Sequence, residues 1–148
     1  MFQAFLIKYG EIGVKGKNRY VFENALVDRM KEVLAETDGT FHIIREQGRI
    51  YVEAEGSFDY DETIEALKRV FGIVGICPVV LTEDHGFEAL SETVLDYMQK
   101  MYGDKTMTFK VMTRRVNKRF PMESMEVNAE LGGRILDQFP NMKVDVHH

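Results

Sequence analysis

The chain has 148 residues, of which 45% are apolar and 29% are charged, and its formal net charge is -5 at pH 7. This composition is that of a soluble globular protein that can bury a core, and the acidic balance argues against a general coating of nucleic acid. No apolar run approaches the roughly 20 residues of a membrane span, and the N-terminus lacks the basic start of a secretory signal. The single cysteine, Cys77, excludes an internal disulfide and a multi-cysteine metal site. We therefore expect a cytoplasmic protein with no membrane segment, in which any binding of nucleic acid is local.

The first 80 or so residues carry the signals of six elements. Residues 2–8 are mostly apolar and predict a strand, and a helix follows from Asn18, a suitable N-cap, to a stop at Gly39. Residues 40–45 and 49–55 predict two strands around a hairpin turn. An apolar stripe that includes Tyr60 and Phe71 predicts a helix over residues 59–71 with Gly72 as its stop. Residues 73–81 predict a last strand, in which Pro78 indicates a sheet edge or a bulge.

The order strand, helix, strand, strand, helix, strand is the ferredoxin-like pattern. It predicts an α+β fold in which an antiparallel sheet carries two helices on one face. We assign residues 1–82 to this N-terminal ferredoxin-like domain (βαββαβ).

The connection from Gly10 to Arg19 has three glycines and three cations before the first helix. Glycines at a helix N-terminus can offer backbone N–H groups to a phosphate. The glycine spacing is wrong for a Walker A loop, and the Rossmann fingerprint would need a parallel sheet. Three interpretations stay open: RNA backbone contact by Lys15, Lys17 and Arg19, an acyl-phosphate hydrolase cradle, or glycines that serve only a tight turn. The hydrolase would need an asparagine in the hairpin region, and residues 40–55 contain none.

A second unit is expected over residues 83–148. Its first helix has an apolar stripe from Phe87 to Tyr102, and its second begins at Ser124, taken as its N-cap, and ends before Pro140. A strand precedes the second helix, and residues 142–146 begin another. A strand that begins so near the terminus predicts a C-terminally incomplete domain, and the lack of a flexible linker predicts that the two units pack together.

The strand before the second helix leads into a cationic run. Between Lys105 and Met122 there are six Lys/Arg residues and no Asp/Glu. Arginine offers a planar fork of donors that matches phosphate oxygens, so this segment predicts a phosphate-contacting surface. The plainer alternative is a solvated basic loop that protects a sheet edge from aggregation.

Other reactive side chains show no functional pattern. The four histidines have no metal-ligand spacing with carboxylates or with Cys77, and the acidic residues near Asp59 are explained by the helix N-terminus. We predict neither a metal site nor catalytic residues in this chain.

Three stretches resemble one family. LIKYGEIGVKGKNRYVFENAL, GIVGICPV and TFKVMTRRVNKRFPMESMEVNAELGGRIL are similar, in this order, to the amino-terminal part of the tRNA 4-thiouridine synthases, also called tRNA sulfurtransferases of thiamine biosynthesis. The resemblance covers essentially the whole chain. It implies that the second unit is a partial α/β THUMP domain.

The resemblance also implies a function. The two domains would hold the acceptor end of a tRNA and present a uridine to a separate PP-loop domain, which uses ATP with magnesium and takes sulfur from a donor linked to a cysteine desulfurase. The PP-loop motif Ser-Gly-Gly-x-Asp-Ser is absent from this chain, so we expect an inactive amino-terminal portion with no cofactor of its own. The family generally forms homodimers. The residues expected to contact RNA are Lys110, Arg114, Arg115, Lys118, Arg119, Lys15, Lys17 and Arg19.

Two further functions stay open. The same recognition unit could serve another THUMP-bearing tRNA modifier, such as a methyltransferase or a uridine isomerase. A pure dimerisation module, whose basic loop meets an acidic face of its twin, is the other possibility.

Overall fold

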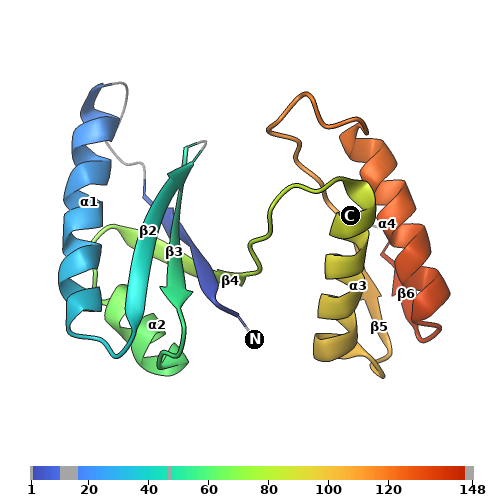
Figure 1. Cartoon of the computed structure of the whole chain (residues 1–148), viewed down its shortest axis with the longest axis horizontal. Coiled ribbons are helices and arrows are strands. Elements are labelled where there is room, and N and C mark those ends of the chain that lie inside the picture. Colours follow the sequence, from blue (N-terminus) through green and yellow to red (C-terminus); the bar gives the residue numbers. More distant parts are fainter. Residues whose placement is uncertain (1, 11–16, 47, 146–148) are drawn as a thin grey trace. The chain divides into compact units, whose positions relative to one another are not determined.

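The computed structural model describes residues 2–10, 17–46 and 48–145, with the side chain of Lys17 left out. The chain forms two compact units, Met1–Thr82 and Glu83–His148. Both units are drawn in Figure 1.

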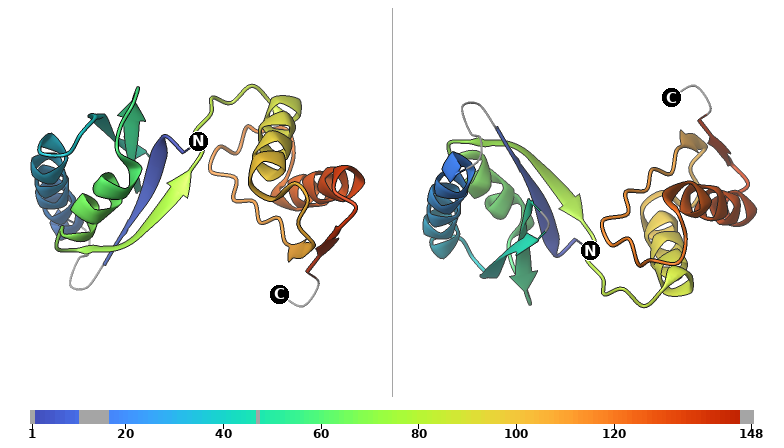
Figure 2. Two further views of the ribbon diagram at one scale, coloured as in Figure 1. Left: turned by 90° about the horizontal axis from the view of Figure 1, so that it is seen from below. Right: turned by 90° about the horizontal axis from the view of Figure 1, so that it is seen from above.

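The first unit has the predicted ferredoxin-like architecture. Its elements are β1 (Ala4–Tyr9), α1 (Lys17–Ala35), β2 (Thr40–Glu46), β3 (Arg49–Glu55), α2 (Tyr60–Lys68) and β4 (Ile73–Val79). The strands form an antiparallel sheet in the order β2-β3-β1-β4. Both helices lie on one face of this sheet (Figure 2). The outermost position of β4 agrees with the prediction from Pro78, because an edge strand tolerates a residue without an N–H donor.

The core of the first unit lies between the sheet and its two helices. Alternate residues of the central strands are buried, because successive side chains of a strand point to opposite faces. They meet the apolar stripe of α1, in which Leu26 and Met30 are fully buried. The fully buried apolar residues of this core are Phe5, Leu26, Met30, Ile50, Val52 and Leu67.

Two sequence predictions for the first unit are corrected. Asn18 is not the N-cap of α1, because the helix already begins at Lys17. The second helix ends at Lys68, so Phe71 falls beyond its stripe and is 84% exposed. Beyond the helix, Gly72 turns the chain toward β4 at φ +104°, a conformation that other residues adopt at a cost. Asp59 does cap α2, where its Oδ1 accepts a bond from the Glu62 N–H at 3.0 Å.

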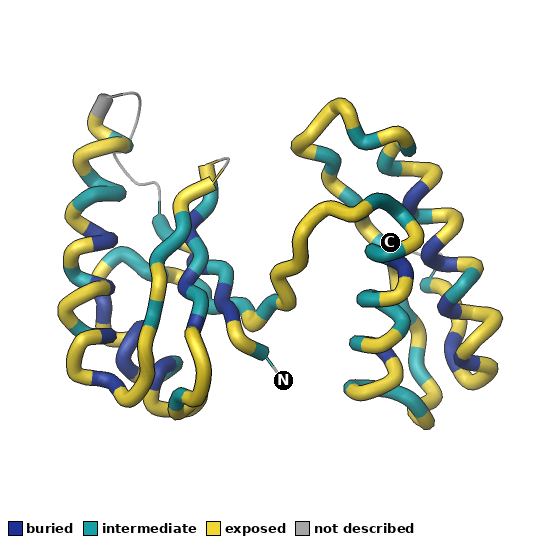
Figure 3. Tube along the Cα trace, viewed as in Figure 1, coloured by how far each residue is buried: buried dark blue, intermediate teal, exposed yellow. Residues whose placement is uncertain are grey.

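The second unit contains two helices and a pair of short strands. Its elements are α3 (Phe87–Tyr102), β5 (Met107–Phe109), α4 (Ser124–Gln138) and β6 (Met142–Val144). The strands β5 and β6 pair in parallel, and Met107 lies opposite Met142. Buried positions recur along α4 (dark blue in Figure 3), and its residue Ile135 forms a core with Met98, Phe139 and Met142.

The second unit also differs from the sequence predictions in detail. Both strands are shorter than expected, because β5 ends at Phe109 and β6 ends at Val144. Ser124 is the first residue of α4, and its N-cap is Glu123. The backbone N–H of Glu123 donates to Oε1 of Glu126 at 3.3 Å, which is the bond from the N-cap backbone to the third helical residue in a capping box.

A bidentate ion pair joins α3 to α4. Two guanidinium nitrogens of Arg134 donate to the two carboxylate oxygens of Glu88 at 2.8 and 2.9 Å. The same guanidinium donates to the buried Ser91 hydroxyl at 3.1 Å and lies 4.8 Å from the centroid of the Phe87 ring. The hydrogen bond from Arg134 lowers the pKa of Glu88 below its ordinary 4.5.

This pair predicts an acid-dependent loss of stability in the second unit. A carboxylate whose pKa is depressed in the folded state stabilises the fold above the unfolded pKa, and the contribution is lost as pH falls through the folded pKa. Substitution Glu88→Gln should therefore lower the midpoint of urea unfolding at pH 7 and reduce its decline below about pH 5. Unfolding curves at several pH values check this, and an unchanged pH dependence in Glu88→Gln would contradict it.

Candidate nucleic-acid interface

The basic segment, residues 105–122, connects β5 to α4. Its chain keeps the two-residue alternation of a strand well past β5. Side chains from Met107 to Arg115 alternate between half-buried and exposed, so Lys110 and Arg114 lie on the exposed side while Thr113 and Arg115 lie on the inner side. Lys118 and Arg119 follow in a turn and are exposed. Four of the five cations predicted here to contact RNA, Lys110, Arg114, Lys118 and Arg119, are therefore open to solvent.

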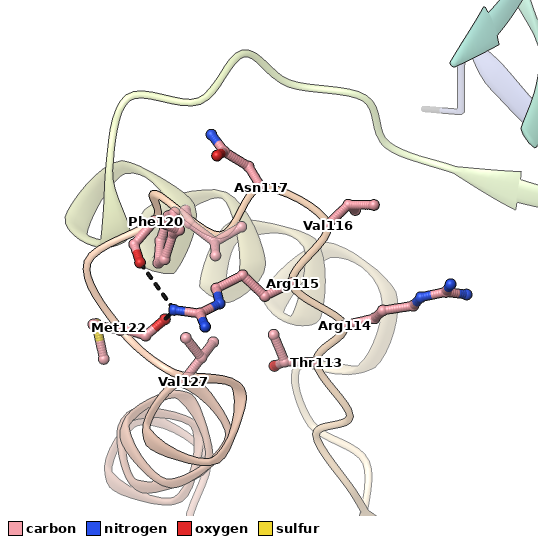
Figure 4. A pocket seen from close by; sticks show the side chains of 9 residues that line it. Thr113, Arg114, Arg115, Val116, Asn117, Phe120, Met122 and Val127 are labelled. Carbon is pink, nitrogen blue, oxygen red and sulfur yellow. Dashed lines mark hydrogen bonds between the residues drawn. The ribbon is translucent and has the colours of Figure 1, made fainter. Parts of the chain in front are cut away.

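Arg115 is placed differently from its neighbours. One of its terminal nitrogens, Nη1, donates to the backbone oxygens of Phe120 at 3.2 Å and of Met122 at 3.3 Å. In Figure 4 its side chain reaches across the loop toward these carbonyls, while Arg114 points away from it. The structure thus uses Arg115 to connect the start of the loop to its end.

A second closure lies inside the loop. The Asn117 side-chain oxygen accepts a bond from the Arg119 N–H at 3.0 Å, and the Asn117 backbone oxygen accepts one from the Phe120 N–H at 3.2 Å. Asparagine favours turns because its short side chain can bond to the backbone two residues further on. These bonds place Lys118 and Arg119 at the tip of a defined turn.

An apolar cavity of about 170 Å³ lies under this loop. Phe120, which could stack on a base or belong to the core, is half-buried and lines the cavity wall. The residues around the cavity are Leu90, Thr113, Arg114, Arg115, Val116, Asn117, Phe120, Met122 and Val127. The basic segment therefore rests on an apolar base formed with α3 and α4.

The first unit contributes a separate group of cations. Of those predicted from the sequence, Lys15 lies outside the described residues, and for Lys17 only the position at the start of α1 is described. Arg19 donates to the Tyr9 hydroxyl at 3.2 Å and to the Gly48 backbone oxygen at 3.4 Å, and pairs with Glu23 at 3.4 Å. Arg19 thus joins α1 to the ends of β1 and β3, and part of its hydrogen-bonding capacity is already used.

Two cations near Arg19, Lys8 and Arg49, were not predicted from the sequence to contact RNA. Ile7 lies opposite Ile50 in the antiparallel register of β1 and β3. The next facing positions, at the end of this strand pair, are Lys8 and Arg49. They line a cavity of about 240 Å³ together with Tyr9 and Arg19. Neither Lys8 nor Arg49 forms an ion pair with any part of the chain that the structure describes. Like charges at facing strand positions repel, which favours an anion beside Lys8 and Arg49, and Arg49 also lies opposite the carboxylate residue Glu46 of β2.

The described residues offer little for other chemistry. They contain no group of three or more His, Cys, Asp or Glu side chains that could hold a metal ion. Cys77 is half-buried in β4 with a free thiol. No helix among residues 2–10, 17–46 and 48–145 has the length and apolar character needed to cross a bilayer.

Comparison with known proteins identifies relatives that resemble essentially the whole chain. A probable tRNA sulfurtransferase of Lachnospira eligens is 62% identical over 147 residues, which are 99% of this chain and 37% of that protein. A probable tRNA sulfurtransferase of Agathobacter rectalis is 54% identical over the full chain and 38% of its own length. The chain thus spans a little over a third of the relatives it matches.

Two solved structures are also similar to this chain over essentially its whole length. A 4-thiouridine synthetase, solved as a complex with RNA and with bound ATP, is 30% identical with a TM-score of 0.79 and covers 100% of this chain, which corresponds to 36% of that protein. The protein PH1313 from Pyrococcus horikoshii is 31% identical with a TM-score of 0.75, over 98% of this chain and 47% of its own.

Two family models divide the chain between them. The model of the ThiI ferredoxin-like domain matches residues 4–77, and the model of the THUMP domain matches residues 85–148. The first match contains β1, β2, β3 and most of β4, and the second contains the basic segment. The chain therefore belongs to the ThiI family, with a ThiI ferredoxin-like domain followed by a THUMP domain.

Proposed function

We propose that this chain is the tRNA-recognition portion of a tRNA sulfurtransferase, a 4-thiouridine synthase of the thiamine biosynthesis family. The observation that carries the proposal is the exposed cation group Lys110, Arg114, Lys118 and Arg119, held on a shaped loop of a THUMP domain. In this function the loop contacts phosphates of the tRNA acceptor end. The bound tRNA then presents a uridine for thiolation by a separate domain.

A local group of cations can give an acidic chain useful affinity for RNA. Each phosphate that a cation neutralises releases condensed counterions, so a few contacts give useful affinity. The net charge of -5 disfavours binding elsewhere on the surface. The proposal thus confines RNA contact to the cationic parts of the two domains.

The catalytic activity is proposed only from the longer relatives, of which this chain spans a little over a third. Thiolation would need ATP with magnesium and a sulfur donor linked to a cysteine desulfurase. For the whole protein we further propose a cytoplasmic location and a homodimer. The residues of this chain do not fit an ATP site of the PP-loop type, because Gly132 and Gly133 lie inside α4, where the backbone N–H groups are committed to the helix. We therefore assign no catalytic step to this chain.

The family also favours this function over its alternatives. The match over residues 4–77 is to the ThiI ferredoxin-like domain, which supports a 4-thiouridine synthase over another THUMP-bearing modifier. It likewise supports RNA contact over acyl-phosphate hydrolysis at the connection between Gly10 and Arg19, which lies mostly outside the described residues.

Binding of the chain to an intact tRNA across a salt series tests the proposal. We expect a linear fall of log affinity with log salt, with a slope of roughly 0.7 to 0.9 for each phosphate contact. A tRNA that lacks its 3′ terminal nucleotides should bind more weakly if the loop holds the acceptor end. Equal binding of both RNAs would limit the basic segment to a nonspecific phosphate track, and no binding at low salt would overturn the proposal.

A double substitution at Lys8 and Arg49 tests a second contact point. If these cations bind the backbone of the acceptor stem, Lys8→Ala with Arg49→Ala should lower tRNA affinity roughly 30-fold at about 0.1 M salt. The loss should be the same for intact and 3′-trimmed tRNA, because both RNAs keep the stem. The matched control removes two exposed cations of the same domain, Lys31→Ala with Lys68→Ala. An affinity loss no larger than that of the control would exclude Lys8 and Arg49 from the interface.

A further inference from the structure

We propose that Arg115 is a positioning residue whose Nη1 orders the basic segment, and that this, rather than phosphate contact, is its main role. The inference rests on the proposed function for its RNA-binding part only. It divides the basic segment into exposed cations that contact the ligand, Lys110, Arg114, Lys118 and Arg119, and one cation that holds the loop in place.

The geometry separates Arg115 from its neighbour Arg114. The strand-like alternation places Arg114 outward and Arg115 inward, and Arg115 is half-buried. Its Nη1 carries two hydrogens, and two carbonyl oxygens lie within 3.3 Å of that nitrogen. Nη1 therefore has no hydrogen left for a phosphate, so any phosphate contact by Arg115 would have to use the hydrogens of Nη2 or Nε.

The two carbonyls that Arg115 binds have a particular place in the chain. They belong to Phe120 and Met122, which flank Pro121 just before α4 begins. Pro121 has no N–H to offer a local bond, so the end of this loop depends on the side chain that crosses it. Asn117 accepts hydrogen bonds from the N–H groups of Arg119 and Phe120, so this turn orders the loop only as far as Phe120. Arg115 therefore connects the turn that carries Lys118 and Arg119 to Met122, just before α4 begins.

Lysine cannot replace this contact although it keeps the charge. Its side chain is one bond shorter, and its ammonium is a compact, strongly hydrated charge without the planar fork of arginine. At a position that only contacts a phosphate, lysine is a fair substitute. This difference separates a positioning role from a ligand-contact role.

The first measurement uses the chain without RNA. We expect Arg115→Lys and Arg115→Met to increase the fast motion of the amides of Met122 and Glu123, at the end of the loop that Arg115 holds, with order parameters that fall from about 0.85 toward 0.6. The matched variants Arg114→Lys and Arg114→Met should leave these amides unchanged. Thermal unfolding of each variant by circular dichroism shows that the domain remains folded. Unchanged order in Arg115→Met would overturn the inference.

The second measurement is tRNA affinity for the same four variants. We expect Arg115→Lys and Arg115→Met both to bind roughly tenfold more weakly, the loss that corresponds to one charge-assisted hydrogen bond. Arg114→Lys should recover most of the affinity that Arg114→Met loses. If Arg115→Lys binds tRNA like the wild type, Arg115 acts as a simple phosphate contact and the positioning role is wrong. If the wild-type chain itself does not bind tRNA, the proposed function fails, and the order of the loop amides still decides whether Arg115 holds the segment.

Discussion

Replacement of Arg114, Lys118 and Arg119 together by alanine is expected to lower tRNA affinity on the order of 100-fold at about 0.1 M salt. These three side chains are exposed on the outer side of the basic segment. At this salt concentration each phosphate contact contributes roughly 0.7 to 0.9 decades of affinity through counterion release, so three contacts contribute about two decades. Because Arg115 stays in place, the loop should keep its shape, and the loss reports contacts alone.

The salt dependence provides the measurement. The slope of log affinity against log salt should fall by about 2 in the triple variant. The matched control removes three exposed cations from helices, Lys31→Ala, Lys68→Ala and Lys100→Ala, and changes the net charge equally. Of these, Lys68 and Lys100 form ion pairs within their own helices, so we expect the control to bind tRNA nearly as well as the wild type. Equal losses in the two triple variants would show that overall charge, and not the basic segment, sets the affinity.

Substitution Phe139→Ala is expected to destabilise the second unit by about 3 to 5 kcal/mol. Phe139 is 2% exposed and packs in the core formed with Met98, Ile135 and Met142. Removal of the ring loses its transfer free energy and leaves a cavity that this small core cannot fill by relaxation. An effect of this size is a large share of the stability of a typical small domain.

Native-state hydrogen exchange measures this effect for each unit separately. Amides of α3 and α4 should lose protection in Phe139→Ala, while those of β1 and β3 belong to a different buried cluster and should keep it. Leu136→Ala is the matched control on α4, because Leu136 is 39% exposed and should cost about 0.5 kcal/mol or less. A loss of protection in α4 that is no greater in Phe139→Ala than in Leu136→Ala would show that Phe139 does not support this core.

Several features were readable from local sequence because short-range chemistry decides them. The apolar stripes of α1 and α3 predicted these helices and the proline in β4 predicted the sheet edge, whereas the glycine at position 72 placed the end of α2 three residues too late. Each signal acts through the conformation of one residue or one helical turn. The order of these elements then sufficed for the ferredoxin-like fold, because few topologies suit the pattern.

For the candidate interface, the sequence predicted only that positive charges cluster in one segment. Spacing identified the cations of residues 105–122 as one group, and it could not show by itself which of them face solvent. The signal that separates Arg115 from Arg114 was present in the alternation that begins at Met107, and continuing it past the strand would have placed Arg115 inward. Lys8 and Arg49 could not be paired from local sequence, because they are 41 positions apart and meet through the strand register.

The sequence by itself determined the order of the elements, the two-domain organisation of the family and the presence of a cationic segment on an acidic chain. Only the tertiary structure decided what each cation does. Arg19 bonds to Tyr9 and Gly48, and Arg115 bonds to the carbonyls of Phe120 and Met122, while Arg114 stays exposed. The physical reason is that secondary structure follows from local conformational preferences, whereas the role of a long charged side chain depends on which distant acceptors the fold brings within hydrogen-bonding distance.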